Sequence, residues 1–209
     1  MPDSIANLTR TTDLFSLKPN WAETPKIDFE FYREVIQFVQ TSINIYDLGE
    51  DTPSMMVYGY TNVNREDYYY ITDFFINHQG KLQRFWLPVW KNAFELVSDI
   101  SSGDNIITIR NVYFNLIERG YERIFIELKN GDFITRSIMT VVDDGDEENI
   151  FLNTSINRDI SINDIKFFGR LMLVRFDDDD LDIDHRSDAV TEIQLNFKEL
   201  PHEYEEIES

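Results

Sequence analysis

The clearest pattern along the chain is an alternation of apolar and polar residues, which is the period of a half-buried strand. The alternation occurs in 27–31 and, over most of its length, in 190–200. Runs rich in β-branched and aromatic residues, which favour extended structure, occur at 35–39, 42–46, 55–60, 84–87, 106–109, 123–128, 133–142, 149–152 and 169–176. The pattern therefore predicts a mainly β protein.

One segment, between about 62 and 80, has the helical period instead. Apolar residues recur there at i, i+3, i+6 and i+7 and form a single stripe, made of Tyr68, Ile71, Phe74 and Phe75. Asn62 or Asn64 can cap the start of this helix, and Gly80 suits the position just beyond its end. The segment therefore predicts one principal helix between two strands.

The texture of the chain changes near residue 98, where short strands alternate with turn signals. The Asn130-Gly131 pair is the strongest short signal for a hairpin, and 143–148 is predicted to be an acidic loop. Strands at this spacing indicate a compact all-β module. We therefore expect four regions, with the last strands returning to the first sheet: an N-terminal arm (1–26), a core that carries the helix (27–97 plus 166–200), an inserted small all-β module (98–165) and an acidic tail (201–209).

The composition excludes several classes of protein. The 209 residues include 19 Lys and Arg against 39 Asp and Glu, a formal net charge of −20. A hydrophobic fraction of 42% supplies enough core material that this acidity does not indicate disorder. The negative charge argues against a protein that grips nucleic acid by its phosphates or docks on an anionic membrane. The absence of cysteine excludes disulfides and thiolate chemistry.

The sequence also lacks membrane and export signals. No apolar run reaches the roughly 18 residues that a membrane span needs. The first residues have no basic region followed by an apolar stretch, as a signal peptide would. We therefore expect no membrane partner and synthesis in a cytoplasm.

The run from Asp177 to Asp184, followed by His185, is the most prominent candidate for chemistry. Carboxylates near a histidine can ligate a hard cation or iron, but the run lacks the glycine and glutamate spacing of a calcium loop. A hydrated acidic loop between two strands is the favoured interpretation. None of the three histidines lies in a recognised hydrolase motif. We therefore predict no catalytic residue, metal site or cofactor, and the alternative of a hydrolase with an acid pair or metal at Asp177–His185 stays open.

Aromatic side chains are concentrated between residues 58 and 90. Such side chains more often fill a helix-on-sheet core and an assembly interface than form a ligand platform. Successive helical residues point about 100° apart, so Tyr68, Tyr69 and Tyr70 cannot all face inward. We expect at least one of them to be exposed. The predicted interface residues are Trp21, Tyr68, Tyr69, Tyr70, Trp86 and Trp90.

Three stretches of this segment form a distinctive series: Tyr58-Gly59-Tyr60, then 66–75 ending in Phe74-Phe75, then 80–90 with Phe85-Trp86-Leu87-Pro88. Together they resemble the distal tail protein group of tailed bacteriophages. The final stretch 193–200, which ends in Glu-Leu, is similar to the last strand of that family's core. The resemblance implies a split β-barrel or sandwich with a flanking helix.

The resemblance further implies a structural subunit of the virion tail, made in the host cytoplasm. Such a subunit forms a homo-oligomeric ring at the baseplate and joins the tail tube to tip or fibre proteins. Its acidity fits a channel through which DNA slides without specific binding, because carboxylates repel phosphate. An alternative is a carbohydrate-binding module of a tail tip, whose aromatic and acidic site is expected within 98–165.

Overall fold

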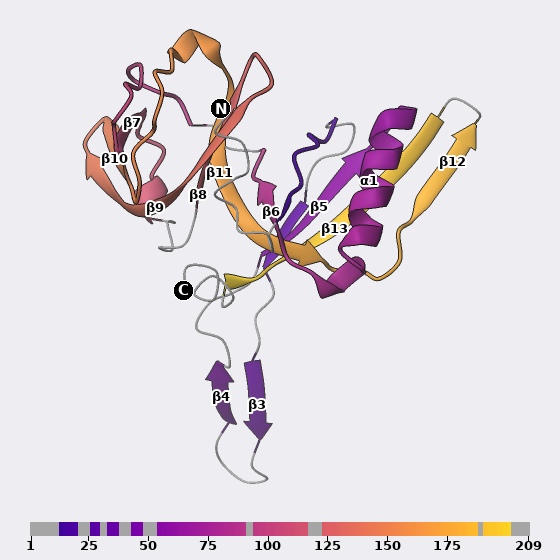
Figure 1. The fold of residues 1–209 in the computed structure, drawn as a ribbon. Coiled ribbons are helices and arrows are strands. Elements are labelled where there is room, and N and C mark those ends of the chain that lie inside the picture. Colours follow the sequence, from indigo (N-terminus) through magenta and orange to yellow (C-terminus); the bar gives the residue numbers. More distant parts are fainter. Residues whose placement is uncertain are drawn as a thin grey trace. The chain divides into compact units, whose positions relative to one another are not determined.

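Most of the described chain is extended, as the alternation of apolar and polar residues predicts. The computed structural model describes residues 13–20, 26–29, 33–37, 43–47, 54–90, 94–116, 123–187 and 190–201 (Figure 1). The strands are β1 (Asp13–Leu14), β2 (Lys26–Phe29), β3 (Arg33–Gln37), β4 (Ile43–Asp47), β5 (Ser54–Tyr60), β6 (Phe85–Pro88), β7 (Ile106–Arg110), β8 (Arg123–Leu128), β9 (Phe133–Asp144), β10 (Glu147–Leu152), β11 (Ile165–Phe176), β12 (Ile183–Ser187) and β13 (Val190–Glu199). Within these ranges α1 (Arg65–Asn77) is the one α-helix, and η1 (Gly80–Leu82), η2 (Phe114–Leu116) and η3 (Ile162–Asp164) are short 3₁₀ turns. The fold is therefore mainly β.

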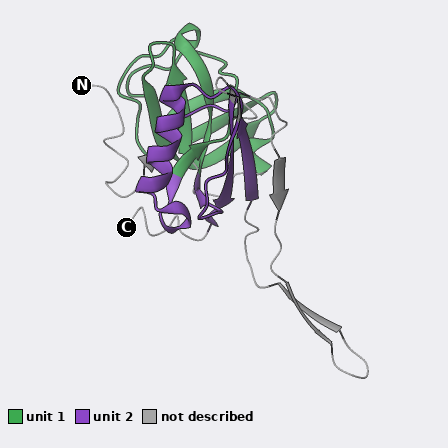
Figure 2. Ribbon diagram, turned by 90° about the vertical axis from the view of Figure 1, so that its right-hand side faces the viewer, with its two compact units in different colours: residues 1–16, 86–172 green, residues 17–85, 173–209 purple. Residues whose placement is uncertain are grey.

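The chain divides into two compact units, and each is built from two stretches of sequence. Unit 1 comprises 1–16 and 86–172, and unit 2 comprises 17–85 and 173–209 (Figure 2). The expected module at 98–165 falls inside unit 1, but unit 1 begins earlier. Its stretch from 86 follows β11: the Val89 N–H donates to the Arg170 carbonyl at 2.9 Å, and the Phe94 N–H donates to the Phe168 carbonyl at 2.7 Å.

The sheet of unit 1 runs in the order β11-β8-β9-β10-β7, and all of these pairs are antiparallel. The predicted Asn-Gly hairpin joins β8 to β9, with Gly131 at a φ of 89° and the Leu128 N–H donating to the Asp132 carbonyl at 2.8 Å. The acidic stretch 143–148 differs from the expected loop. It forms a tight hairpin between β9 and β10, and only Gly145 and Asp146 lie outside the strands.

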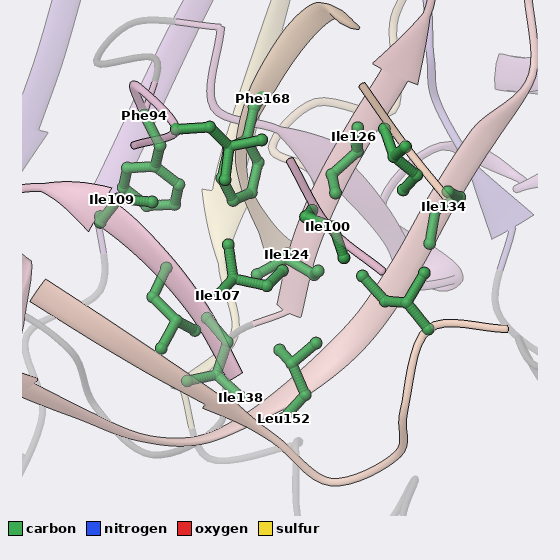
Figure 3. Close-up of a cluster of buried hydrophobic side chains, with 14 of the residues drawn as sticks. Phe94, Ile100, Ile107, Ile109, Ile124, Ile126, Ile134, Ile138, Leu152 and Phe168 are labelled. Atoms are coloured by element: carbon green, nitrogen blue, oxygen red, sulfur yellow. The ribbon is translucent and has the colours of Figure 1, made fainter. Parts of the chain in front are cut away.

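The core of unit 1 is dominated by aliphatic side chains. Figure 3 shows isoleucines of β7, β8 and β9 pointing toward one another, with Phe94 and Phe168 beside them. The buried members include Ile107, Ile109, Ile124, Ile126, Ile134, Ile138, Ile150, Leu152, Ile156 and Ile160. Alternation on the strands supplies this face: β10 alternates between partly and fully buried residues along its whole length.

The sheet of unit 2 brings the last strand back to the first part of the chain, as predicted. β13 lies antiparallel to β5, in a register that runs from Ile193 opposite Tyr60 to Lys198 opposite Met55. β2 pairs with the other side of β5, and β12 and the last residues of β11 pair with β13. The strands β3 and β4 pair with each other as an antiparallel hairpin.

The helix α1 begins and ends with defined caps. The side chain of Asn64 accepts a hydrogen bond from the Asp67 N–H at 2.8 Å, which is one of the two caps predicted. Gln79, not Gly80, is the first residue beyond the end with a left-handed backbone, at a φ of 53°. Gly80 is also left-handed, at 61°, and starts η1. The helix therefore turns directly into η1.

Aromatic rings pack α1 onto this sheet. The ring centroid of Phe74 lies 4.9 Å from that of Phe85, and Phe75 lies 4.9 Å from Phe176. Ile71, from the same predicted stripe, is fully buried. None of the helices in the described ranges is long and apolar enough to cross a membrane.

Candidate functional site

An acidic cleft in unit 2 gathers several polar side chains around an open space. It has a volume of about 310 Å³ and is lined by Phe75, Phe176, Asp178, Asp180, Asp182, Gln194 and Asn196. The phenylalanines come from α1 and the end of β11, the aspartates from the run after β11, and the amides from β13. The cleft therefore combines an aromatic wall with carboxylates and amides.

Strand alternation puts the amides on the open side of β13. Ile193, Leu195 and Phe197 are buried, while Gln194 and Asn196 point to the opposite face. The Asn196 amide donates to the Asp178 carboxylate at 2.8 Å. The Asp177 N–H donates to the Asn196 carbonyl at 2.9 Å. These bonds hold the start of the aspartate run against β13.

The other side of the aspartate run is fixed at the end of α1. The Lys81 N–H donates to the Asp179 carboxylate at 3.0 Å. A Cβ added at Gly80 would lie 2.8 Å from an Asp179 carboxylate oxygen and 3.0 Å from its Cα, so only glycine allows this approach. The run is thus a positioned loop between η1 and β13.

A second cleft of about 200 Å³ continues along the same strand. It shares Asp182 and Gln194 with the first cleft, and its other lining residues are Gly59, Tyr60, Thr61, Asp184, Glu192 and Ile193. Burial, with smaller contributions from Tyr58, Tyr70 and Asp67, raises the pKa of Tyr60 well above its usual value. The Tyr60 hydroxyl is therefore a neutral donor at neutral pH, and it donates to the Leu17 carbonyl at 3.1 Å.

The aspartate run was also the candidate metal site. In the described part of the chain, no group of three or more histidine, aspartate or glutamate side chains converges as metal ligands would. His185 lies on β12, which the sequence did not predict, and its Nδ1 lies 3.1 Å from the Thr191 hydroxyl. The cleft can instead accept hydrogen bonds from, and attract, cationic or hydroxyl-rich groups.

The three successive tyrosines of α1 differ in their exposure to solvent. Tyr69 is 54% exposed, which confirms that one of the three must face outward. Tyr68 and Tyr70 are half-buried. The ring of Tyr68 lies 5.6 Å from that of Tyr69 and 6.2 Å from that of His185. Tyr69 is therefore the most accessible of the predicted interface residues that the structure describes.

The two described tryptophans lie in the core of unit 1. The Arg123 guanidinium lies 4.9 Å from the ring centre of the buried Trp86. The ring of Trp90 lies 4.8 Å from that of Phe167 and 5.8 Å from that of Phe125. Both rings therefore have close neighbours within unit 1. Trp21 lies outside the described residues.

Two glutamates that were not predicted as functional residues are buried, Glu148 and Glu199. Glu148 accepts hydrogen bonds from the N–H groups of Val112 and Asn115, at 3.0 and 2.8 Å. Glu199 accepts one from the Ser54 N–H at 2.9 Å. The only sequence signal for either is its place on the apolar side of an alternating strand, since Glu148 precedes Ile150 and Leu152 at intervals of two.

No protein-family model matches the chain, and no curated protein matches it.

Proposed function

We propose that the protein is a structural subunit of a bacteriophage tail, a ring-forming distal tail or baseplate adaptor that joins the tail tube to tip or fibre proteins. The observation that supports this most is how the stretches that carry the resemblance fold. The stretches that carry the resemblance fold as strand β5, helix α1 and, after η1, strand β6, and the final stretch returns as β13 beside β5. In this proposal, that sheet with its helix is the split-barrel core.

Two features of unit 2 suit ring formation. β2 ends the strand order of the described sheet, and an outermost strand can accept a strand or arm from a neighbouring subunit. Tyr69 presents an aromatic ring on α1, and tyrosine is enriched in interfaces. The exposed carboxylates of the aspartate run would repel DNA phosphates if they face the channel.

The test is the oligomeric state of the purified full chain, measured by native mass spectrometry and electron microscopy. We expect closed rings of one stoichiometry. Tyr69→Ser should shift the population toward smaller species, because it removes the exposed ring while leaving the buried face of α1 intact. Gln83→Ser, at an exposed polar position after η1, should leave the rings unchanged. A strictly monomeric chain, alone and with tail-tube proteins, would overturn the proposal.

A second candidate function is binding of a host-surface carbohydrate. It is favoured by the acidic cleft, where Phe75 and Phe176 adjoin carboxylates and amides able to bond sugar hydroxyls. In this proposal the carbohydrate site is the acidic cleft of unit 2, whereas the sequence predicts a site within 98–165. A glycan array with the wild-type chain, Gln194→Ala and the unit 1 control Asp144→Asn tests this. A glycan bound by all except Gln194→Ala would support it, and an array without signal would exclude it.

A further inference from the structure

The loop of residues 111–116 in unit 1 displays apolar side chains to solvent. Val112, Tyr113 and Leu116 are 44%, 66% and 74% exposed. Between them, Phe114 is fully buried, and its ring lies 4.9 Å from that of Phe94 in the core. Phe114 therefore fixes the loop to the core, while Val112, Tyr113 and Leu116 face solvent. Folding of the unit does not require these apolar side chains to be exposed.

Buried hydrogen bonds hold the backbone of this loop in one conformation. The fully buried Glu148 carboxylate accepts from the N–H groups of Val112 and Asn115, at opposite ends of the tip. The Asn111 side chain accepts from the Tyr113 N–H at 2.8 Å. Tyr113 has a φ of 59°, a left-handed backbone that is unfavourable for a non-glycine residue. The loop is thus preorganised, which reduces the entropy lost on binding.

The loop is bound to a strongly acidic hairpin. The Asn111 side chain donates to the Asp143 carboxylate at 3.0 Å and to the Gly145 carbonyl at 2.7 Å. The Asn111 N–H donates to the Asp146 carbonyl at 2.9 Å. Asp143, Asp144 and Asp146 are all exposed at this β9–β10 turn. The loop with its exposed apolar side chains therefore adjoins the exposed carboxylates of this turn.

We propose that the 111–116 loop is a docking site for a different protein, one that offers an apolar cleft rimmed by lysine or arginine. Charge complementarity selects this occupant: the apolar tip fills a cleft, and the aspartates of the β9–β10 turn face a basic rim, which speeds encounter and fixes orientation. The same surface of a second copy is disfavoured as the occupant, because Asp143, Asp144 and Asp146 would then face their own counterparts. The inference goes beyond the tail role and does not depend on it.

The probes are two synthetic amphipathic peptides of equal length, one alternating leucine with lysine and one alternating leucine with glutamate. Binding to the full chain is measured by fluorescence anisotropy, and its position by hydrogen exchange. We expect the lysine peptide alone to bind and to slow exchange in 111–116 and in the β9–β10 turn. Its affinity should fall at high salt, because salt screens exposed charges.

Three variants divide the contributions. The pair Tyr113→Asn and Leu116→Ser removes the apolar groups, and asparagine tolerates the left-handed backbone; it should weaken binding roughly tenfold or more. Asp144→Asn with Asp146→Asn should weaken binding and reduce its salt dependence. Glu148→Gln keeps the apolar groups but removes a carboxylate oxygen that holds the loop, so it should weaken binding through lost preorganisation.

The control is Asp159→Asn with Asp73→Asn, two exposed positions outside both clefts, which removes the same charge away from the loop. Equal weakening by this pair and by the β9–β10 pair would show attraction to net charge alone and would overturn the proposal. Protection of a different surface, or binding that Tyr113→Asn with Leu116→Ser leaves unchanged, would also overturn it. Self-association of the peptide-free chain that this pair abolishes would identify a second copy as the occupant and contradict the proposed partner.

Discussion

The two units fill their hydrophobic cores with different kinds of side chain. Unit 1 buries mainly isoleucine and leucine on its strands, whereas unit 2 packs α1 onto its sheet through a cluster of phenylalanines. Branched aliphatic residues fit the regular spacing of strand faces. Flat rings span the larger and less regular gap between a helix and a sheet. The aromatic concentration of the sequence is therefore, in large part, the helix-on-sheet core of unit 2.

A buried glutamate in each unit sharpens this comparison. Glu199 in unit 2 accepts a hydrogen bond from the N–H of Ser54, the first residue of β5. Glu148 in unit 1 holds a loop whose apolar side chains face solvent. The same chemistry, a carboxylate on backbone N–H groups, thus serves the fold in one unit and a surface in the other.

The largest expected effect comes from truncating one core residue in each unit. Phe85→Ala in unit 2 should lower the free energy of unfolding by about 3–5 kcal/mol, and Ile109→Ala in unit 1 by about 2–5 kcal/mol. Phe85→Leu and Ile109→Val should cost less, because they leave smaller cavities. Urea unfolding measures the loss, and hydrogen exchange locates it. Equal loss of protection in both units from either variant would show one cooperative core and remove the distinction.

Removing the buried glutamates should cost less than removing a core ring. Glu199→Ala and Glu148→Ala each leave buried backbone donors unsatisfied, and each should lower stability by about 1–3 kcal/mol. Only Glu148→Ala should also weaken binding of the lysine peptide. The comparison of the two glutamates fails if Glu199→Ala weakens peptide binding as strongly at a temperature where both variants are folded.

Two glycines with left-handed backbones separate strain from close contact. In Gly145→Ala the added methyl group has no neighbour within contact distance, so unit 1 should lose only the free energy of a strained left-handed backbone, about 1 kcal/mol. Gly80→Ala in unit 2 adds a clash with Asp179 and should destabilise more, and it should displace the aspartate run from the acidic cleft. Thermal unfolding of the two variants tests this, and equal losses would mean that the Asp179 contact gives way freely.

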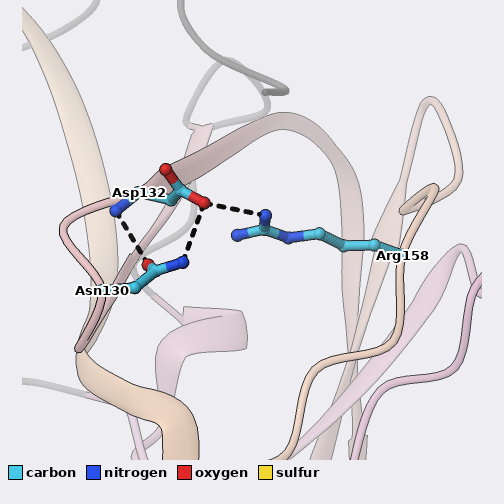
Figure 4. A network of polar contacts seen from close by, with 3 residues as sticks. All are labelled: Asn130, Asp132 and Arg158. Carbon is cyan, nitrogen blue, oxygen red and sulfur yellow. Dashed lines mark hydrogen bonds and ion pairs between the residues drawn. The ribbon is translucent and has the colours of Figure 1, made fainter. Parts of the chain in front are cut away.

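The smallest effect is a dependence of unit 1 on acid pH. The Arg158 guanidinium, with Asn130, holds the pKa of Asp132 below its usual value, and Figure 4 shows both groups bonded to that carboxylate. A lowered pKa in the folded state stabilises the fold above the unfolded pKa of about 3.9, and this contribution is lost as pH falls through the folded pKa. Asp132→Asn should therefore flatten the fall in stability on acidification.

Urea midpoints measured between neutral and acid pH report this slope, and Asp144→Asn, at an exposed position, provides the control. An unchanged slope in Asp132→Asn would mean that Arg158 contributes nothing to the acid dependence.

Local patterns predicted the elements whose stability is local. The Asn64 cap, the stripe around Ile71 and the Asn130-Gly131 hairpin were all readable, because their signals lie within a few residues. β12 was not, since Ile183–Ser187 lacks an apolar alternation and is extended through its pairing with β13. Only part of the acidic cleft could be predicted. The aspartates form a conspicuous run in the sequence, but Phe75 and the β13 amides come beside them only through long-range pairing. Glu148 and Glu199 are buried, although charged residues are usually exposed, because N–H donors distant in sequence compensate the cost of burying them.

The most direct test of the proposed tail role is to search for the chain in purified phage tails by cryo-electron microscopy. We expect copies of the chain to form a closed ring at the distal end of the tail tube. The density should show the sheet and helix of unit 2. Complete tails that contain no copy of the chain, by density and by mass spectrometry of the same particles, would contradict it.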